Sequence, residues 1–467
     1  MCRCRSASQP GRALARVGPQ TRPAPPAGSR WAAGRARPPG TRCTRAHPRS
    51  RSRRTSAGGG GCRRVARSAN GAPRSQSPTV RVHPHEIGRS SVVNTVEDPG
   101  QERIGSAPRR GPGPDSGPRT RYGVAVSSLL RRRTARALLW SVLAAPPLRA
   151  RVPIQRTGPL PTLRPQQPLT LLLWNVQFAA GRDQIFFYDG GSAVHVAPDV
   201  VVRSLDRIGE VLRELDADLV LLQEVDRSSD RTGRIDQLAA LLQRAPYPLH
   251  LSAPYHRSPY IPFPAHQHLG RMDMHLAVLS RVQLQEAIRH QLPALHEPWL
   301  RRQFNLRRAL LELRLPRQRA GPLAVLETHL SAFSRGDGTL PRQVAALVRH
   351  LCRLDREAVP WVLGGDFNAL PPGDDPARLG AAAGLYPEIV SPISVLFDRW
   401  RPAISASAHR SDPQRWRTWL PPGEPLAERA LDHAFTSDGL EVLEVEVLHR
   451  FDDISDHLPI RLVVRIP

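Results

Sequence analysis

Apolar residues recur with regular spacing only after about residue 165. Unbroken apolar runs at 169–176 and 219–222 predict buried strands. Pro198 and Asp199 suit the first turn of a helix, because apolar residues then recur at helical spacing at Leu205, Ile208, Leu212 and Leu215. The chain beyond residue 165 is therefore expected to contain both helices and strands.

The same patterns predict further helices at 235–244 and 341–354, and further strands at 275–279, 309–315, 323–328, 361–363, 442–448 and 460–466. The segments 253–270 and 371–425 are rich in proline and predict irregular loops. Loops of that length in a compact domain are often functional. Helices and strands mixed in this way, with strand pairs at the end, predict an α/β fold with two sheets between helices.

Residues 1–165 are rich in Arg, Pro, Gly, Ser and Ala and show no apolar period. Such a segment buries too little apolar surface to offset the loss of chain entropy, so we expect it to be disordered. It is either an Arg-rich arm that binds anions or acts as a transit peptide, or an upstream stretch of a GC-rich gene read into the protein. The absence of lysine favours the second interpretation. Residues 166–467 are expected to form the folded domain.

The formal net charge of +26 is unevenly distributed. Residues 1–170 contain 33 arginines and 5 acidic residues, whereas residues 171–467 contain 34 arginines and 36 acidic residues. The excess positive charge therefore gives no reason to assign nucleic-acid binding to the second part. The five cysteines, of which only Cys352 lies in the second part, predict neither a disulfide framework nor a zinc site.

No segment reaches the roughly 20 apolar residues that cross a bilayer. The apolar stretch 137–145 follows a group of arginines and precedes Pro146 and Pro147, an order that resembles a signal peptide. It could act as one only if translation began near Val124 or Val126. We expect a cytoplasmic monomer, or a secreted protein if translation starts near Val124.

Polar residues able to do chemistry cluster where the predicted strands begin or end. Strand ends at one edge of a sheet can bring such groups into a single cleft. The clusters are Trp174-Asn175, Gln223-Glu224, Thr328-His329, Asp366-Phe367-Asn368, Leu431-Asp432-His433 and Ser455-Asp456-His457.

Three of these residues suit a hard divalent cation. Mg²⁺ and Mn²⁺ prefer carboxylate and carbonyl oxygens, which Asn175, Glu224 and Asp456 could supply. Taken singly, an asparagine after a strand is usually a turn or cap residue, and a lone glutamate is usually a solvated carboxylate.

The remaining residues suit hydrolysis. Water needs a base, for which His329 and His457 are candidates, and Asp432 could fix the tautomer of such a base. Asp366 and Asn368 could hold a phosphate or the attacking water. A lone histidine is more often structural than catalytic, so only the combination of these groups carries weight.

In combination, six strings occur in the order typical of the endonuclease/exonuclease/phosphatase superfamily, which this sequence resembles over about 300 residues. Gly-Asp-Phe-Asn and Ser-Asp-His-Leu-Pro are the specific strings and the others are supporting. The six are Leu-Trp-Asn-Val (173–176), Leu-Gln-Glu-Val (222–225), Thr-His-Leu (328–330), Gly-Gly-Asp-Phe-Asn-Ala-Leu-Pro (364–371), Leu-Asp-His-Ala-Phe (431–435) and Ser-Asp-His-Leu-Pro-Ile (455–460).

The resemblance implies a four-layer α/β sandwich, in which two mixed sheets are flanked by helices. It implies hydrolysis of a phosphoester with Mg²⁺, or Mn²⁺, at or beside Asn175, Glu224 and Asp456. It also implies that His457 acts as general base or transition-state stabiliser and that Asp432 orients it. The metal would offset charge on the phosphoryl oxygens and the leaving group.

Further similarities to and differences from the motifs of individual branches of this superfamily bear on the substrate. By resemblance, Asp366 and Asn368 bind the phosphate and position the nucleophile or leaving group. His329 matches a second histidine of the deoxyribonuclease-like and sphingomyelinase-like branches and argues against apurinic endonucleases. The residues 429–432 lack the Trp-Cys-Asp-Arg string usual in inositol polyphosphate 5-phosphatases. Some branches use a tyrosine, but no motif assigns Tyr255 or Tyr260.

DNA, RNA, lipid and small phosphoesters all remain open as substrates, with a phosphodiesterase or nuclease favoured. One alternative is a lipid phosphodiesterase whose membrane-facing surface consists of Trp299, Phe304, Trp400, Trp416 and Trp419. Another is a non-catalytic nucleic-acid-binding protein that uses the Arg-rich arm. A domain that has lost catalysis is expected to lack a ligand residue, and none is missing here.

Overall fold

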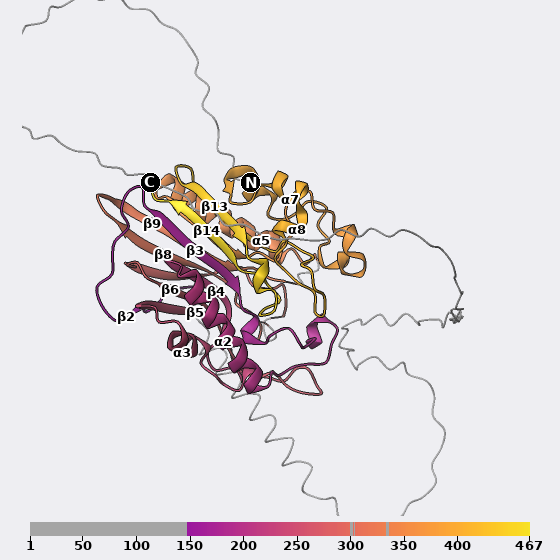
Figure 1. Cartoon of the computed structure of the whole chain (residues 1–467). Coiled ribbons are helices and arrows are strands. Elements are labelled where there is room, and N and C mark those ends of the chain that lie inside the picture. The colour runs from indigo at the N-terminus through magenta and orange to yellow at the C-terminus, as the bar shows by residue number, and fades with distance from the viewer. Residues whose placement is uncertain (1–146, 299–301, 303, 333–335) are drawn as a thin grey trace, which may run out of the picture. The chain divides into compact units, whose positions relative to one another are not determined.

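The computed structural model describes residues 147–298, 302, 304–332 and 336–467. Most of the region predicted to be disordered, the signal-like stretch 137–145 and Trp299 lie outside the described residues. Within the described part, two seven-stranded sheets lie face to face with helices on their outer sides (Figure 1).

Both sheets are mixed. The parallel pairs are β9 with β10 and β3 with β4, and the other neighbouring strands are antiparallel. The first sheet has the order β1 (Arg149–Arg151), β7 (Glu286–Gln291), β8 (Ala309–Arg317), β9 (Ala320–His329), β10 (Trp361–Asp366), β12 (Asp432–Thr436) and β11 (Arg401–Pro402). The second has the order β13 (Glu441–Val447), β14 (Ile460–Arg465), β3 (Pro168–Asn175), β4 (Leu219–Asp226), β6 (Gly270–Ser280), β5 (Leu249–Ile261) and β2 (Gln155–Arg156).

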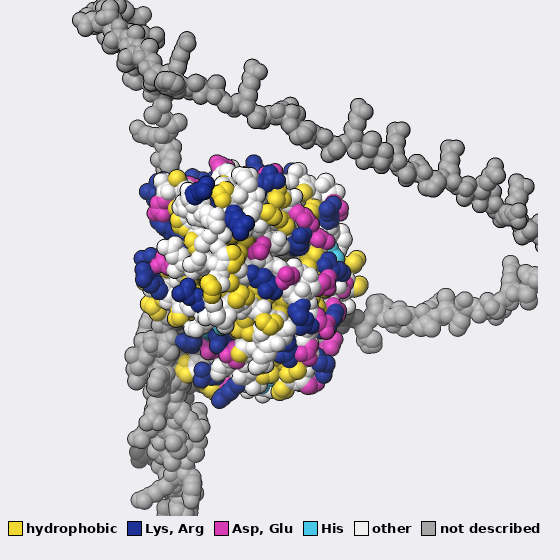
Figure 2. All heavy atoms as spheres, turned by 60° about the vertical axis from the view of Figure 1, so that its left-hand side comes forward, with side chains coloured by type: hydrophobic (Ala, Val, Ile, Leu, Met, Phe, Trp, Pro, Cys, Tyr) yellow, Lys and Arg dark blue, Asp and Glu magenta, His cyan; other side chains and the backbone are white. Residues whose placement is uncertain are grey.

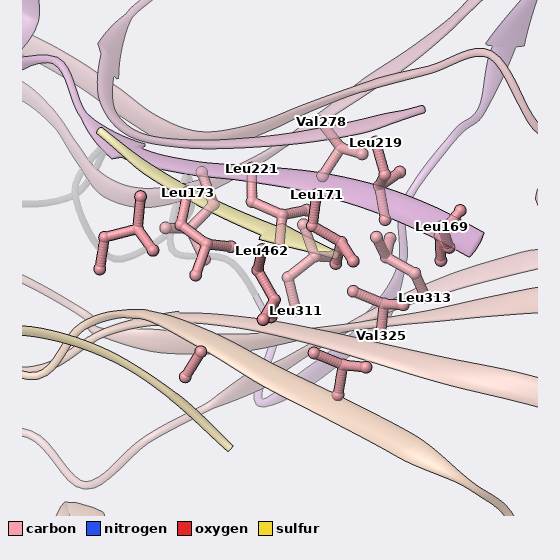
Figure 3. Close-up of a cluster of buried hydrophobic side chains, with 14 of the residues drawn as sticks. Leu169, Leu171, Leu173, Leu219, Leu221, Val278, Leu311, Leu313, Val325 and Leu462 are labelled. Carbon is pink, nitrogen blue, oxygen red and sulfur yellow. The ribbon is translucent and has the colours of Figure 1, made fainter. Parts of the chain in front are cut away.

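The main hydrophobic core fills the space between the sheets. Leu169, Leu171 and Leu173 alternate along β3 and point to the same side, as the two-residue period of a strand requires. They belong to one buried cluster with Leu311 of β8 and Val325 of β9, from the facing sheet (Figure 3). The alternating leucines of the central strands therefore hold the two sheets together.

Helices cover the outer face of the second sheet. Leu172 and Trp174, on the other side of β3, are buried with residues of α2 (Pro198–Leu215) and α3 (Gln237–Arg244). Because β3 is buried on both faces, its sequence is an unbroken apolar run rather than an alternating one.

Helices also cover the outer face of the first sheet. Leu326 of β9 and Leu363 of β10 are buried with residues of α5 (Thr339–Arg356) and α6 (Ser394–Arg399). The described part is thus a four-layer α/β sandwich, as the sequence predicts. The short elements are η1 (Gln177–Ala179), η2 (Phe187–Asp189), η3 (Asp230–Thr232), η4 (Pro376–Leu385), α7 (Ala406–Ser411), α8 (Pro413–Trp416) and η5 (His449–Phe451).

The prediction of an irregular loop over 253–270 is wrong for the first half of that segment, because β5 extends to Ile261. Pro254 and Pro259 lie within this strand. They are tolerated because β2 covers only the first two residues of β5, so that most of its outer edge has no strand to bond. Register shifts against β6 also fall beside both prolines.

The predicted irregular segment over 371–425 contains short helices, namely η4, α6, α7 and α8. It also contains three of the aromatic residues predicted to face a membrane. Trp400 and Trp416 are buried at 9% exposure, which contradicts that prediction. The indole nitrogen of Trp400 donates to Asp355 at 2.8 Å. Trp419 lies under the guanidinium of Arg429, 4.1 Å from it.

The folded part begins before residue 166. Ala150 of β1 pairs with Arg289, and β2 pairs with the start of β5. Leu163 is fully buried in the core between the sheets. Strands of three and two residues are too short to produce a recognisable apolar period, so the sequence pattern places this segment outside the domain.

The surface of the described part carries both signs of charge. In the face shown in Figure 2, arginine and acidic side chains are interspersed and hydrophobic side chains lie between them. This agrees with the near balance of arginine and acidic residues after residue 170. No helix among the described residues is long and apolar enough to cross a membrane.

Candidate active site

The strand register of the first sheet brings three predicted site residues together. β9 and β10 are parallel, so both end at the same edge of the sheet, with His329 paired to Asp366. β12 runs antiparallel to β10 and begins at Asp432, which is also paired to Asp366. His329, Asp366 and Asp432 therefore lie side by side, although more than 100 residues separate the first from the last.

The second sheet contributes Asn175 and Glu224 at the ends of its parallel strands. Asn175 pairs with Gln223, and the register of β4 against β6 shifts between Leu222 and Val225. Glu224 lies in this bulge with a φ of 61°, in the left-handed region. A bulge redirects a side chain, and here the Glu224 carboxylate turns toward Asn175 and His329.

The loop before β14 carries Asp456 and His457 and is held by hydrogen bonds. Trp174 donates its indole N–H to the carbonyl of His457 at 2.8 Å. The Ser455 hydroxyl donates to the carbonyl of Asn175 at 2.8 Å. The specific string around Ser455 therefore fixes the loop against the end of β3.

Two glycines of the Gly-Gly-Asp-Phe-Asn string allow close packing at the site. A Cβ on Gly365, whose φ is 138°, would lie 2.0 Å from the carbonyl oxygen of Thr328. A Cβ on Gly364 would lie 2.7 Å from a methyl group of Leu173, in the opposite sheet. Gly365 therefore tolerates no side chain, whereas a side chain at Gly364 would require Leu173 to shift.

His457 and Asp432 form a buried pair. Nδ1 of His457 donates to Oδ2 of Asp432 at 2.7 Å, and Nε2 lies 3.8 Å from Oδ2 of Asp366. Burial alone would lower the pKa of His457, but the charges of Asp432, Asp366 and Asp456 outweigh burial and hold this pKa well above its ordinary value. The pair leaves Nε2 free to exchange a proton with a substrate or water.

His329 lies in a second chain of contacts. Its Nε2 is 3.2 Å from Oδ2 of Asp366, and its Nδ1 is 3.2 Å from the hydroxyl of Tyr255. Burial, helped by the charges of Arg308 and His457, holds the pKa of His329 well below its ordinary value. The contacts are mutually consistent if Tyr255 donates to Nδ1 and the neutral ring donates from Nε2 to Asp366.

Asn368 follows Asp366 in a left-handed turn, with a φ of 50° that asparagine tolerates better than most residues. Its backbone N–H donates to Oδ1 of Asp366 at 2.9 Å. Its side-chain amide donates to the carbonyl of Leu330 at 3.0 Å. Asn368 therefore orients the Asp366 carboxylate through its backbone and has its amide oxygen available.

The charge of His457 compensates the buried carboxylates of the site only in part. Burial raises the pKa of Asp366 to about 7. Burial also raises the pKa of Asp456 to about 7, with added repulsion from Glu224, Asp189 and Asp366. Among the described residues, no arginine forms an ion pair with Glu224, Asp366 or Asp456. Such a group of carboxylates suits a divalent cation, which would remove the repulsion.

The residues differ in how well they suit a cation. Asp366, Asp432 and His457 each place one ligand atom within 4.8 Å of the others, but the last two are already bonded to each other. Asn175 donates its amide N–H to Asp366 at 3.0 Å and accepts from the Gln177 N–H at 3.0 Å. Asn175 therefore orients the Asp366 carboxylate, and its oxygen, which accepts one backbone N–H, keeps a second lone pair.

Three neighbours of the site carry no sequence motif. Tyr255 contacts His329, as described above. Arg308 is 5% exposed, its Nε and Nη1 have no hydrogen-bond partner among the described residues, and its charge lowers the pKa of His329. Asp189 of η2 has its pKa raised to about 6 by burial and by the charge of Glu224. Only the fold brings these three beside the motif residues.

Fold and site together define a phosphoesterase-like α/β sandwich, and the family comparison agrees. The model of the endonuclease/exonuclease/phosphatase family matches residues 172–457. The chain belongs to this family, whose members are hydrolases that act on phosphoesters.

Solved structures with similar folds include an endonuclease/exonuclease/phosphatase from Beutenbergia cavernae, with 22% identity, a TM-score of 0.45 and coverage of 64% of this chain and 72% of that one. The human Nocturnin catalytic domain has 17% identity and a TM-score of 0.43, with coverage of 67% and 96%. A mannosyl-6-phosphatase from Bacteroides thetaiotaomicron has 15% identity and a TM-score of 0.39, with coverage of 63% and 99%. No curated protein matches the chain.

Proposed function

We propose that this protein is a divalent-metal-dependent phosphodiesterase in which His457, oriented by Asp432, handles the proton of the attacking water. The observation that carries the proposal is the pair itself, with Nδ1 and Oδ2 2.7 Å apart and Nε2 directed at Asp366. A histidine fixed through one nitrogen presents the other in a single orientation, as general acid–base catalysis requires.

Glu224 and Asp456 are the proposed metal ligands, and Asn175 positions the neighbouring carboxylates. Mg²⁺ or Mn²⁺ bound there would offset negative charge on the phosphoryl oxygens and the leaving group. The fit rests on the donor set, because these are oxygen ligands without an arginine partner, and hard cations prefer oxygen.

His329, Asp366, Asn368 and Arg308 are proposed to bind the phosphate. His329 is neutral and donates to Asp366, which restrains that carboxylate, while the amide of Asn368 faces the same edge of the sheet. Nε and Nη1 of Arg308 are buried and have no hydrogen-bond partner among the described residues. A buried, unpaired guanidinium is costly, and an anionic substrate would offset that cost.

A diester is favoured over a monoester by charge. A phosphodiester carries one negative charge, whereas a monoester carries up to two at neutral pH. The site combines the carboxylates of Glu224, Asp366 and Asp456 with Asp189 nearby. The less charged substrate meets less repulsion there. Trp400 and Trp416 give no support to a lipid-facing surface because they are buried.

The test is a substrate screen on the full-length protein with Mg²⁺ or Mn²⁺, using DNA, RNA, sphingomyelin vesicles, bis(p-nitrophenyl) phosphate and p-nitrophenyl phosphate. We expect hydrolysis of at least one diester, no hydrolysis in excess chelator, and strongly reduced hydrolysis by His457→Ala. Activity that survives the chelator would refute the metal site. Hydrolysis of monoesters alone would refute the diester assignment but leave the metal site standing.

A further inference from the structure

A second group of metal-binding side chains lies on the outer face of the first sheet, beneath α5. Glu312 of β8 has a side chain only 2% exposed. His290 of β7 and His350 of α5 each place Nε2 3.0 Å from the same oxygen, Oε2 of Glu312. The register pairs Ile288 with Glu312, so His290 is its diagonal neighbour on the same face of the sheet.

The two contacts of Nε2 of His350 in this group require opposite protonation states of that nitrogen. Nε2 of His350 is 3.0 Å from Oε2 of Glu312, which as a carboxylate only accepts, and 3.1 Å from Nη2 of Arg353, which only donates. One ring nitrogen cannot donate to the first and accept from the second at the same time. One contact is therefore unsatisfied in either tautomer. Nη2 of Arg353 is also 3.2 Å from Oε2, so a positive charge already lies beside both Glu312 and His350.

We infer that His290, Glu312 and His350 form a binding site for a transition-metal ion of the zinc class, separate from the catalytic site. The three ligand atoms lie within 4.8 Å of one another. Ligands 2.0–2.2 Å from a tetrahedral Zn²⁺ lie roughly 3.3–3.6 Å apart, so a small expansion of the group would accommodate the ion. Two imidazole nitrogens select zinc and its neighbours over Mg²⁺.

The site is reachable from solvent. The side chain of His290 is 22% exposed and that of His350 is 12% exposed. Water can therefore enter as a fourth ligand, which three protein ligands leave room for. The ion would connect β7 and β8, which are already paired strands, to α5, where the rings of His290 and His350 also contact each other.

The two arginines of the group do not block the ion. Arg314 pairs with Oε1 of Glu312, the oxygen that the histidines do not contact. The side chain of Arg353 is 35% exposed, and its Nη1 already contacts Glu357 at 2.9 Å. Arg353 can turn toward Glu357 and solvent when the ion binds, because exposed ion pairs contribute little to stability.

The experiment measures zinc binding to the full-length protein by calorimetry and by thermal unfolding, with Mg²⁺ present in excess throughout. We expect one Zn²⁺ to raise Tm by several degrees. His290→Ala and His350→Ala should abolish that shift, whereas His268→Ala, which removes an exposed histidine elsewhere, should retain it. Arg353→Gln should tighten zinc binding by roughly tenfold, because a competing positive charge is removed.

Two results would overturn the inference. One is a zinc-induced shift of equal size in His290→Ala, His350→Ala and the unaltered protein. The other is zinc binding that weakens in Arg353→Gln, since the arginine would then support the ion rather than compete with it. If an alanine variant fails to fold, His290→Gln keeps a donor toward Glu312. The visible spectrum of bound Co²⁺ then decides between a four-coordinate site at these residues and none.

Discussion

Buried carboxylates at two places in this protein differ in how far neighbouring side chains compensate their charge. Glu312 is enclosed by two arginines and two histidines. Burial alone would raise its pKa, but hydrogen bonds from His290 and His350 and the charge of Arg314 hold that pKa far below its ordinary value. Asp456 has no arginine partner within the described part of the chain, and burial raises its pKa to about 7.

The difference separates a carboxylate whose charge is compensated by neighbouring side chains from carboxylates whose charge is compensated much less. Burying a charge costs free energy unless it is paired. At Glu312 the protein provides most of the compensation itself. At Asp366 and Asp456 it does not, so folding is opposed by groups that a cation or substrate would stabilise. Uncompensated buried charges of this kind concentrate at functional sites.

The largest expected effect tests whether the site that contains Asp366 and Asp456 is catalytic. His457→Ala and Asp432→Ala should each reduce kcat by 10²–10⁴-fold, the usual cost of losing a general base. Because the two residues act as one unit, the double variant should be hardly worse than the worse single variant. Turnover and Tm are measured on all three variants, with the substrate found in the screen.

A purely structural role for His457 predicts a different outcome. Loss of the side chain would then lower Tm and leave the turnover of the folded protein nearly unchanged. Strictly additive losses in the double variant would contradict the proposed pair even if both residues mattered. The exposed histidine variant His268→Ala provides the control, with turnover expected to be unaltered.

The second prediction compares the two regions directly. Glu312→Gln should lower the free energy of unfolding by about 3 kcal/mol, because it leaves positive groups without their partner. Asp456→Asn should raise it by about 1 kcal/mol at pH 8 in the presence of chelator. A carboxyl whose pKa is raised in the folded state loses stability as the pH climbs from about 4 to about 7, and the amide removes this loss.

Urea denaturation at pH 8 measures both changes. A loss of stability in Asp456→Asn as large as that in Glu312→Gln would contradict the proposed difference in charge compensation between Asp456 and Glu312. With Mg²⁺ added, the unaltered protein should gain stability and Asp456→Asn should not, since binding to the folded state alone raises stability.

A third, smaller effect comes from a buried histidine outside both regions. His409 is 6% exposed, and its Nε2 has no hydrogen-bond partner among the described residues. Burial, with the charge of His433, lowers its pKa to about 3. A lowered histidine pKa means that stability is lost as the pH falls below about 6.5, by up to about 1.4 kcal/mol per pH unit.

His409→Phe should therefore flatten the fall in stability between pH 6.5 and pH 5. Phenylalanine keeps the ring that packs against Phe397, so the core contact is preserved. Thermal unfolding across this pH range provides the measurement. An unaltered slope in His409→Phe would show that other groups, such as His256, dominate the acid response.

The smallest expected effect concerns the Arg-rich region. Deleting residues 1–146 should change neither the stability of the domain nor the metal response by more than about 0.5 kcal/mol, the usual limit for surface changes. If the arginines of this region compensated the site carboxylates in solution, the deletion would instead alter both. Deleting residues 1–165 is the contrasting variant and should lower Tm, because it removes the buried side chain of Leu163.

The regular elements and the motif residues were accessible from sequence because each depends on neighbours in the chain. The unbroken apolar run of β3 and the helical spacing in α2 are local patterns, and the structure confirms both elements. β1 and β2 were not predicted because they are too short to show a recurring pattern of apolar residues. β5 was not predicted because proline usually excludes a strand, and only the open edge of the sheet makes Pro254 tolerable.

By itself, the sequence determined the α/β class, the family resemblance and the residues from which a hydrolytic site could be built. Tertiary structure decided how those residues are used. The bulge at Glu224, the engaged oxygen of Asn175, the approach of Tyr255 and Arg308 to His329, and the meeting of His290, Glu312 and His350 all depend on register and packing. These contacts join residues far apart in the chain, and a local pattern carries no information about which distant strand or helix will lie beside it.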